Sequence, residues 1–396
     1  MTMVKYELPA GWAKFDALAV SDGLMRARAA MLALTQIPYQ RDWADEMQKV
    51  QLKREVAGTS RIEGAEFTER ELDAAMLETP DQLETRSQRQ AAAAVRTYRW
   101  IADLPPDRPV DAGLIREVHR LVVSGADDDH CEPGVLRGPD NNVTFGAPPH
   151  RGADGGDECA RAFAGLCRAI GREFRGLDPL VQALALHYHF AAIHPFLDGN
   201  GRTARALEAL MLQRVGLKDT LFIAMSNYYY ENKPGYLKAL TDTRAGGHDL
   251  TPFLLFGLAG IEKQCNRLLR EISRNVSRAL FRNVMYDLYN RLKSTRKRVL
   301  AERQIEILKL LLANDELPLL KLGELTRAHY AGLRNPGKAF TRDINDLLGL
   351  RAVGFRREGK DYHLHARLEW PAEITETEFF RNVRKLPRSK TSGFLT

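Results

Sequence analysis

The segment His194–Arg205, His-Pro-Phe-Leu-Asp-Gly-Asn-Gly-Arg-Thr-Ala-Arg, constrains the fold of this chain more than any other part of its sequence. Apolar residues with helical spacing precede and follow it: Ala183, Leu186, Phe190 and Ile193, then Ala204, Leu207, Leu210 and Met211. The pattern predicts two helices joined by a short loop, with the second helix beginning at Gly-Asn-Gly-Arg. Free backbone N–H groups and the positive dipole end at such a helix start favour a phosphate.

The residue types in this loop suit phosphate binding, although each also fits an ordinary structural role. Glycines permit positive φ and close approach of the backbone to an anion, and Arg202 and Arg205 offer paired planar donors. Taken singly, the histidine could cap a helix, Gly-Asn-Gly could be a plain turn, and the arginines could be solvated. Because a structural turn does not need all of these together, they predict a functional site, with Phe196 as its anchor in the core.

The segment resembles the signature of the Fic family (filamentation induced by cAMP), His-Pro-Phe-x-Asp/Glu-Gly-Asn-Gly-Arg-x-x-Arg, at every fixed position. The resemblance implies a mainly α fold, a Fic-type helical bundle with a β-hairpin flap. It also implies a protein adenylyltransferase, which moves AMP from ATP to a Ser, Thr or Tyr hydroxyl of a target protein. A kinase-type branch of the family has Lys where this chain has Gly201, so Gly201 favours AMP transfer over phosphate transfer.

Roles for the individual residues follow from their chemistry and from the resemblance. His194 can accept the proton of the attacking hydroxyl, because imidazole titrates near neutral pH. Asp198 is a hard oxygen ligand for Mg²⁺, or for Mn²⁺, bound together with the substrate phosphates. The resemblance implies that ATP lies against Gly199, Asn200, Gly201, Arg202, Thr203, Ala204 and Arg205. In this arrangement Arg202 neutralises the leaving pyrophosphate and Arg205 binds the γ-phosphate.

A second motif, Thr59-Ser60-Arg61-Ile62-Glu63-Gly64, resembles the inhibitory-helix motif of the family, Ser/Thr-x-x-x-Glu-Gly/Asn. The resemblance implies that Glu63 pairs with Arg205 and occupies the donors that the γ-phosphate needs. Two unit charges about 4 Å apart attract by roughly 4 kcal/mol at an effective dielectric of about 20, and a third of that shifts occupancy about tenfold. Alternatively, Glu63 is solvated and Thr59 is a helix cap. The resemblance also allows a reverse activity, in which Glu63 orients a water that removes AMP.

Two further segments resemble parts of the family fold. Between Pro133 and Arg151 the helical period is lost, which predicts a hairpin or extended loop. In the family a flap at this place binds the target segment by strand addition, although a surface hairpin without function is the alternative. The tyrosine-rich segment 226–236 is similar to the one that flanks adenine, so Tyr236 and Leu240 are candidates for that wall. Leu237 stands where the family often has a second tyrosine, and core packing explains these tyrosines equally well.

Composition and length predict a multidomain protein without membrane segments. The chain has 396 residues, a net charge of +7, no apolar run long enough to cross a bilayer, and no signal-peptide block. Its four cysteines lack metal-ligand or disulfide spacing, so we expect reduced thiols in a cytoplasmic protein. The expected parts are an N-terminal helical module with the inhibitory helix (1–90), the catalytic core (91–275), a winged helix-like domain (276–375) and a basic tail (376–396), disordered from Arg381 onward.

The C-terminal part resembles a winged helix-turn-helix by pattern alone. Three amphipathic helical segments are followed by an alternating stretch, Val353–Leu364, with a hairpin turn. Arg356 and Arg357 could contact the phosphates of DNA. A module for protein docking or for homodimer formation is the alternative. The second interpretation of the whole chain is therefore an ATP-sensing, DNA-binding transcriptional regulator, in place of an adenylyltransferase whose partners are target proteins.

Overall fold

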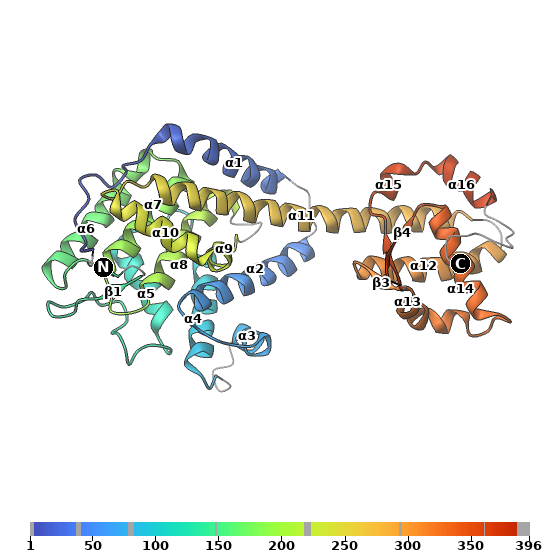
Figure 1. Cartoon of the computed structure of the whole chain (residues 1–396), viewed down its shortest axis with the longest axis horizontal. Helices are drawn as coiled ribbons and strands as arrows, with labels where there is room; N and C mark the ends of the chain where they lie inside the picture. Colours follow the sequence, from blue (N-terminus) through green and yellow to red (C-terminus); the bar gives the residue numbers. More distant parts are fainter. Residues whose placement is uncertain are drawn as a thin grey trace. The chain divides into compact units, whose positions relative to one another are not determined.

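The computed structural model describes residues 4–36, 41–77, 83–146, 149–217, 223–292, 295–359 and 361–385. The chain forms two compact units, residues 1–269 (unit 1) and 270–396 (unit 2). Both are mainly helical, and two small sheets complete the fold, as the sequence predicts (Figure 1). No helix over the described residues is long and apolar enough to span a bilayer. Residues 386–396 of the expected tail lie outside the described part.

Unit 1 is a bundle of helices. Its elements are α1 (Ala17–Gln36), α2 (Arg41–Ile62), α3 (Glu69–Met76), α4 (Arg86–Asp103), α5 (Ala112–Val123), α6 (Asp157–Gly171), η2 (Phe174–Gly176), α7 (Pro179–Ile193), α8 (Asn200–Leu212), η3 (Gln213–Leu217), α9 (Met225–Glu231), α10 (Lys233–Ala245) and the first half of α11 (Thr251–Asn290). Polar N-caps fix several helix starts. Thr68 and Thr85 form capping boxes, and the predicted cap Asp111 accepts from the N–H of Leu114 at 2.9 Å.

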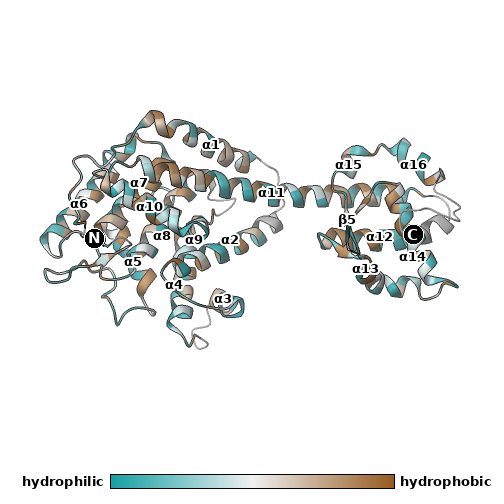
Figure 2. Cartoon of the chain, in the orientation of Figure 1, coloured by the Kyte–Doolittle hydropathy of each residue, from teal (hydrophilic) through white to brown (hydrophobic). Residues whose placement is uncertain are grey.

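Helix α7 lies at the centre of unit 1 and carries the signature loop at its C-terminus. From Leu180 to Ile193 every residue except Gln182 is buried, and most of the helix has the apolar colour in Figure 2. A helix that is apolar on all sides needs neighbours on all sides, and α6, α8 and α10 pack against it. The loop after α7 is therefore held by the best-packed part of the unit.

The boundaries of the compact units differ from those expected from the sequence. The expected boundary at 90/91 falls inside α4, and the one at 275/276 falls inside α11. Helix α4 packs against α2, α3, α5 and α8, and its alanines 91–94 are buried. The N-terminal module and the catalytic core therefore share one core, because α4 contributes to both of them.

The predicted hairpin before α6 is present. Strand β1 (Thr144–Phe145) pairs antiparallel with β2 (His150–Arg151). Ala147 and Pro148, at the predicted turn, lie outside the described residues. The N-terminal segment covers the other edge of β2, because Val4 bridges His150 and its carbonyl accepts from the N–H of Arg151 at 2.9 Å.

Unit 2 combines helices with a three-stranded sheet. Its elements are the rest of α11, α12 (Thr295–Ala313), β3 (Leu317–Pro318), α13 (Leu319–Thr326), η4 (Arg327–Tyr330), α14 (Pro336–Gly349), β4 (Val353–Glu358), β5 (Asp361–Ala366), α15 (Trp370–Glu373) and α16 (Glu376–Lys385). The sheet is antiparallel with strand order β3-β5-β4, and β4 and β5 form the predicted hairpin. Three helices and a hairpin agree with the predicted pattern, and the winged-helix assignment itself stays a prediction.

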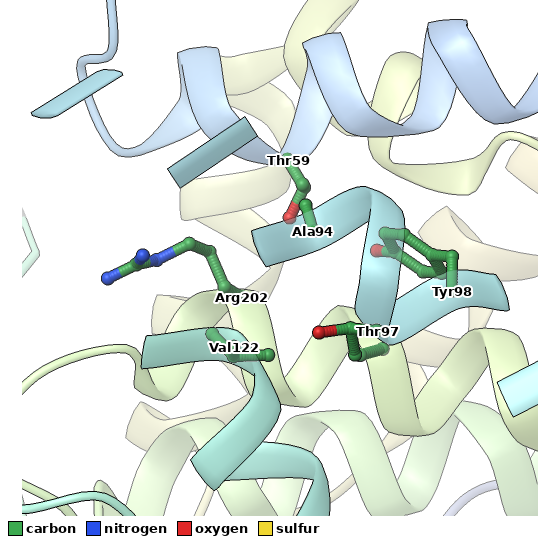
Figure 3. A pocket seen from close by; sticks show the side chains of 7 residues that line it. Thr59, Ala94, Thr97, Tyr98, Val122 and Arg202 are labelled. Carbon is green, nitrogen blue, oxygen red and sulfur yellow. The ribbon is translucent and has the colours of Figure 1, made fainter. Parts of the chain in front are cut away.

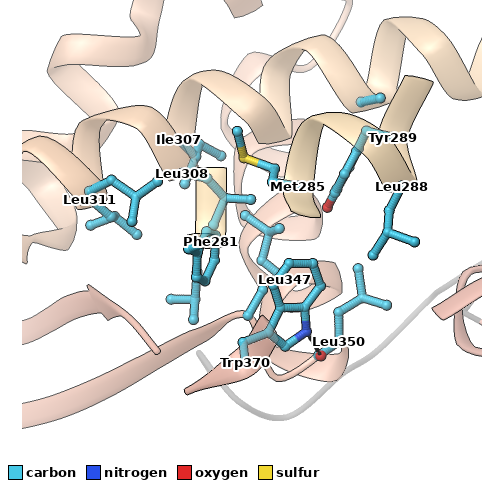
Figure 4. Close-up of a cluster of buried hydrophobic side chains, with 14 of the residues drawn as sticks. Phe281, Met285, Leu288, Tyr289, Ile307, Leu308, Leu311, Leu347, Leu350 and Trp370 are labelled. Carbon is cyan, nitrogen blue, oxygen red and sulfur yellow. Dashed lines mark hydrogen bonds between the residues drawn. The ribbon is translucent and has the colours of Figure 1, made fainter. Parts of the chain in front are cut away.

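The core of unit 2 includes part of the segment that we expected to be a tail. Phe281, Met285, Leu347 and Trp370 lie in one apolar cluster (Figure 4). Phe379 of α16 is fully buried in the same cluster, with its ring centroid 5.4 Å from that of Tyr289. The expectation of disorder from Arg381 is therefore wrong as far as Lys385, because apolar residues anchor this basic segment as a helix.

Candidate active site

The turn after α7 is fixed by its backbone and by a buried arginine. His194 adopts a left-handed conformation with φ 54°, which ends the helix. The Arg137 side chain donates to the carbonyl oxygens of His194 at 2.8 Å, Asn141 at 2.6 Å and Ala153 at 2.6 Å. Arg137 is buried, so it links the flap region to the turn. No spacing rule pointed to this residue in the sequence.

The imidazole of His194 is oriented as a base. Its Nδ1–H donates to the carbonyl of Ala191 at 3.1 Å, which leaves Nε2 unprotonated. The ring stacks on Phe145 of the flap, with centroids 3.9 Å apart and planes 10° apart. Burial lowers the pKa of His194 to about 4, because the charged form loses its hydration. At neutral pH the free side chain is therefore a neutral imidazole with an available lone pair.

The loop between α7 and α8 is braced from within. The Asn200 side chain accepts from the N–H of Phe196 at 2.9 Å and donates to its carbonyl at 2.8 Å. His119 of α5 stacks under Phe196 with centroids 3.7 Å apart. Its Nδ1 accepts from the N–H of Gly134, and its Nε2–H donates to the carbonyl of Asp198 at 3.0 Å. The Asn200 side chain therefore closes the loop, which leaves its backbone N–H group for phosphate contact.

Arg202 is held by acidic side chains on both sides. Its guanidinium donates to the buried Asp127 at 2.6 Å and lies 3.5 Å from Asp198. Arg86 and Gln90 of α4 also donate to Asp127, at 2.6 and 2.9 Å. Although burial opposes it, the charge of Arg202 holds the pKa of Asp127 below its ordinary value. Asp127, Arg86 and Gln90 could not be identified from the sequence, since their positions follow no motif.

Asp198 could bind a metal ion only as the single ligand that the protein supplies. Its side chain is 38% exposed and lies 3.0 Å from Arg86. The described residues contain no cluster of three or more His, Cys, Asp or Glu side chains that could hold a metal ion. Mg²⁺ commonly binds through one carboxylate, substrate phosphates and water. The arrangement therefore suits a metal that arrives with a nucleotide, and the carboxylate would exchange Arg86 for it.

Arg205 is bound by the predicted inhibitory motif. It donates to the carboxylate of Glu63 at 2.6 Å, to the Thr59 hydroxyl at 2.9 Å and to the Thr59 carbonyl at 3.1 Å. Arg205 is buried, whereas the Glu63 side chain is 39% exposed. Desolvation works against ionisation of Glu63, but the charge of Arg205 keeps its pKa below the ordinary value. Gly64 follows with φ 89° and lets the chain turn away after α2.

Two glycines of the loop have structural reasons to be glycine. A Cβ on Gly201 would lie 2.1 Å from Oε1 of Glu63 and 3.1 Å from Nη1 of Arg205. A Cβ on Gly199, which has φ 72°, would lie 2.6 Å from the Val123 side chain. The Glu63 carboxylate therefore sits directly against the first turn of α8. This is the position at which the backbone N–H groups of a helix favour an anion.

The remaining predicted residues have different surroundings. Thr203 and Ala204 are fully buried, and the N–H of Thr203 already donates to the carbonyl of Gly199 at 2.9 Å. Tyr236 of α10 is buried, and its ring stacks on Tyr229 with centroids 4.7 Å apart. Leu240 is half-buried one turn later. Tyr229 covers one face of the Tyr236 ring, so at most the other face is free for an adenine.

Helix α2 is anchored close to the site. The buried Glu55 carboxylate accepts from the N–H of Ser226 at 2.7 Å and from the Tyr98 hydroxyl at 2.9 Å. A Cβ on Gly58 would lie 2.5 Å from the backbone of α9, so only glycine allows this approach of the two helices. Figure 3 shows a small cavity where α2, α4, α5 and α8 meet; Thr59, Ala94, Thr97, Tyr98, Val122, Arg202 and Ala206 line it. The two motifs thus meet in one packed region.

Comparisons with known proteins support the predicted resemblance. Residues 109–212 match the model of the Fic/DOC family. Protein adenylyltransferase Fic of Nematostella vectensis is 35% identical over 142 residues, which is 36% of this chain and 30% of that protein. Protein adenylyltransferase fic-1 of Caenorhabditis elegans is 35% identical over 80 residues, 20% of this chain and 14% of that protein. The chain thus matches less than a third of the length of either relative.

Solved structures share the fold. A Fic family protein from Desulfovibrio desulfuricans aligns with a TM-score of 0.56 at 17% identity, over 91% of this chain and 99% of that one. Fic-1 from C. elegans aligns with a TM-score of 0.53 at 20% identity, over 65% of this chain and 75% of that one. At such identities the similarity establishes the fold, in agreement with the prediction of a Fic-type helical bundle.

Proposed function

We propose, from the premise that residues 109–212 are a Fic domain, that the protein transfers AMP from ATP to a hydroxyl side chain of a target protein and that Glu63 inhibits this transfer. One observation carries the proposal. The Glu63 carboxylate lies 2.6 Å from Arg205 and against Gly201, at the start of α8. A triphosphate bound to the same donors must displace this carboxylate.

The base in the reaction is His194. Its Nε2 accepts the proton of the target hydroxyl, whose oxygen attacks the α-phosphorus of ATP. The bond from the α-phosphorus to the bridging oxygen breaks, and pyrophosphate leaves with its electron pair. Burial keeps the imidazole neutral before the nucleotide binds, and the negative charge of a triphosphate would raise its pKa toward the range of an effective base.

The charges of ATP are matched by the residues of the loop and of α8. Arg202, fixed by Asp127 at 2.6 Å, stabilises the negative charge that develops on the leaving pyrophosphate. Arg205 binds the γ-phosphate after Glu63 has left. Mg²⁺, or Mn²⁺, held by Asp198 and the phosphates, would neutralise phosphate charge when bound. Asp127 acts only through Arg202 and is a positioning residue.

The flap is the binding place for the target segment. Val4 occupies the outer edge of β2, so we propose that a target strand pairs with β1 instead. Phe145 of β1 stacks on the His194 ring. A target strand added to β1 would therefore pass close to the base, held by backbone hydrogen bonds that tolerate different sequences.

Transfer of labelled AMP tests the proposal. The 396-residue chain and its Glu63→Gly variant are incubated with α-labelled ATP, Mg²⁺ and a cell lysate, and labelled proteins are counted. We expect strong labelling with Glu63→Gly, weak labelling with the unchanged protein, and none when His194→Ala is added. Glu66→Gly, at an exposed position nearby, is the control. Equal labelling by the unchanged protein and Glu63→Gly contradicts inhibition, and no labelling by either contradicts AMP transfer.

Removal of AMP is the reverse activity included in the proposal. A target modified by the Glu63→Gly variant is purified and incubated with the unchanged protein, and the loss of label is followed. If Glu63 orients the attacking water, the unchanged protein releases AMP and Glu63→Gly does not. Retention of the label with both proteins restricts the activity to AMP addition.

DNA binding by unit 2 is a second candidate function, and the distribution of charge on α14 and the loop before it favours it. Arg334 and Lys338 are exposed, and neither has a carboxylate partner among the described residues. The acids of the same helix, Asp343 and Asp346, are buried against α12. Arg356 of the hairpin pairs with carboxylates at 3.2 and 3.1 Å, whereas Arg357 donates to the carbonyl of Gly359 at 3.1 Å. Arg334, Lys338 and Arg357 are therefore exposed cations that could contact DNA.

Fluorescence anisotropy with a labelled DNA duplex tests this second function. We expect the unchanged chain to bind DNA with an affinity that falls steeply as the salt concentration rises. Arg334→Ala/Lys338→Ala should weaken this binding and reduce the slope of log K against log salt by about 2. Arg291→Ala/Arg381→Ala removes the same charge from the residue that follows α11 and from α16, and serves as a control. Equal binding of poly-glutamate would assign the surface to acidic proteins instead.

A further inference from the structure

A buried carboxylate fastens α2 to two neighbouring helices about two turns before Glu63. Glu55 accepts from the N–H of Ser226 on α9 at 2.7 Å and from the Tyr98 hydroxyl on α4 at 2.9 Å. The Ser226 hydroxyl donates to the same carboxylate, and Glu55 is 1% exposed. Burial of a carboxylate is costly unless donors surround it, so these bonds favour one position of α2. Nothing in the proposed reaction uses Glu55.

Gly58 determines how closely α2 approaches α9. A Cβ on this residue would lie 2.5 Å from two backbone atoms of α9. Backbone atoms cannot rotate aside as a flexible side chain can, so a larger residue must push α2 away from α9. The next residue, Thr59, accepts from Nε of Arg205 at 2.9 Å, and Glu63 accepts from the same guanidinium at 2.6 Å. The contact with α9 and the contacts with Arg205 are therefore made by the same end of α2.

A third contact holds the last residue of α2. The Lys233 ammonium, at the start of α10, donates to the carbonyl of Ile62 at 2.8 Å. The last carbonyls of a helix have no partner within it, and its C-terminus favours a cation. Ile62 directly precedes Glu63, so this bond helps to fix the backbone from which the inhibitory side chain extends.

The ion pair of Glu63 depends on this support. The Glu63 side chain is 39% exposed, whereas that of Arg205 is 2% exposed, so packing holds the arginine more firmly than the glutamate. The two groups are 2.6 Å apart. A displacement of α2 by about 1 Å would therefore take them beyond the range of a hydrogen bond.

We propose that Glu55 and Gly58 are positioning residues for inhibition: they place α2 against α9 so that Glu63 reaches Arg205, and they take no part in AMP transfer itself. The inference rests on the proposed function, in which Glu63 competes with the γ-phosphate. If these residues only stabilised unit 1, their substitution would slow transfer whether or not Glu63 is present. The dependence on Glu63 therefore separates the two roles.

Rates of AMP transfer by the 396-residue chain, with and without Glu63→Gly, test the inference. The probe is α-labelled ATP with Mg²⁺ and a cell lysate, at an ATP concentration below KM and at about pH 8. Gly58→Ala should raise the rate about tenfold when Glu63 is present, because overpacking against backbone displaces α2. In the Glu63→Gly chain the same substitution should change the rate less than about twofold.

Glu55→Gln is a second variant that keeps the shape of the side chain. Burial raises the pKa of Glu55 to about 7, so at about pH 8 the carboxylate is mainly ionised. Glutamine lacks the charge that strengthens these hydrogen bonds and replaces one acceptor oxygen by a donor. We expect transfer about threefold faster when Glu63 is present, and no change in the Glu63→Gly chain.

Gly165→Ala is the matched control. A Cβ on Gly165 would lie 2.8 Å from the Trp12 ring, so alanine overpacks this position as well, but it lies on α6, which packs against α7. We expect no acceleration from it. The same change in rate with and without Glu63, or no acceleration by Gly58→Ala and Glu55→Gln when Glu63 is present, would overturn the positioning role. Equal rates for the unchanged chain and Glu63→Gly would overturn the proposed inhibition, and this inference with it.

Discussion

Glu63 and Gly201 are neighbours in space although 138 positions separate them, and a Cβ on Gly201 would lie 2.1 Å from Oε1 of Glu63. The Glu63 carboxylate therefore needs a glycine at the start of α8, just as a phosphate would. In the proposed function, inhibitor and substrate depend on the same backbone geometry, so a single side chain would act as a substitute for part of the nucleotide.

Glu63→Gln should relieve inhibition partially. Glutamine keeps the size of the side chain and one acceptor oxygen for Arg205, but it loses the charge that strengthens the hydrogen bond. At ATP concentrations below KM we expect AMP transfer about tenfold faster than in the unchanged protein, and slower than in Glu63→Gly. Initial rates with labelled ATP give this comparison, and Glu66→Gln is the control. A rate equal to that of Glu63→Gly would mean that charge supplies all of the inhibition.

Asp127→Asn should impair transfer through Arg202. The carboxylate is fully buried and accepts from Arg86, Gln90 and Arg202, so an amide in its place leaves two guanidinium groups less well paired. We expect transfer in the Glu63→Gly background to fall at least about tenfold, and the free energy of unfolding to fall by about 3 kcal/mol. Asp129→Asn, at a 79% exposed position, should change neither. Unaltered transfer would show that Arg202 needs no positioning by Asp127.

The sequence revealed the candidate nucleotide-binding residues better than the residues that hold them. His194, Asp198 and Arg205 occur in one continuous signature, so the sequence predicted that they lie close together. The supporting residues Arg137 and Asp127 come from the connection between α5 and β1, and only the tertiary fold brings them against His194 and Arg202. No periodicity or spacing connects such residues, because their contacts depend on the tertiary fold.

The same limit explains the error at the C-terminus. The high charge and the absence of a long apolar pattern suggested a disordered tail. In the structure, the adjacent Phe379 and Phe380 pack against the apolar cluster of unit 2 and anchor α16. Only the three-dimensional core of unit 2 shows that Phe379 has a place to pack. The expected domain boundary at 90/91 was misplaced for the same reason. The alanines of α4 allow close packing on both sides of that boundary, and only the tertiary fold shows their neighbours.

Phe379→Ala should therefore destabilise unit 2. Removal of a fully buried phenylalanine leaves a cavity, and we expect the free energy of unfolding of this unit to fall by about 3–5 kcal/mol. Denaturant unfolding, combined with limited proteolysis to identify the unit that opens first, measures the effect. Glu378→Ala, on the same helix and with a 42% exposed side chain, should cost less than about 0.5 kcal/mol. Equal effects of the two substitutions would indicate that α16 does not contribute to the core.

Acid should destabilise unit 1, because two of its buried histidines resist protonation in the folded state. Burial lowers the pKa of His189 to about 3 and that of His119 to about 4. His189 uses Nε2–H to donate to the carbonyl of Trp12 at 2.8 Å, and its buried Nδ1 has no partner. In His119 the Nδ1 accepts from the N–H of Gly134. A proton on either Nδ1 would therefore be buried without an acceptor.

Protonation of these histidines links the free energy of unfolding to pH. Between about pH 6.5 and pH 4 the unfolded chain binds protons at these histidines and the folded chain does not, so stability is complete above about pH 6.5 and declines as the pH falls. Each histidine contributes a slope of up to about 1.4 kcal/mol per pH unit. Denaturant unfolding from pH 7 to pH 4.5 should show this decline. His189→Gln should reduce the slope, whereas His130→Gln, at an exposed position, should not. An unchanged slope in His189→Gln would assign the acid sensitivity to other groups.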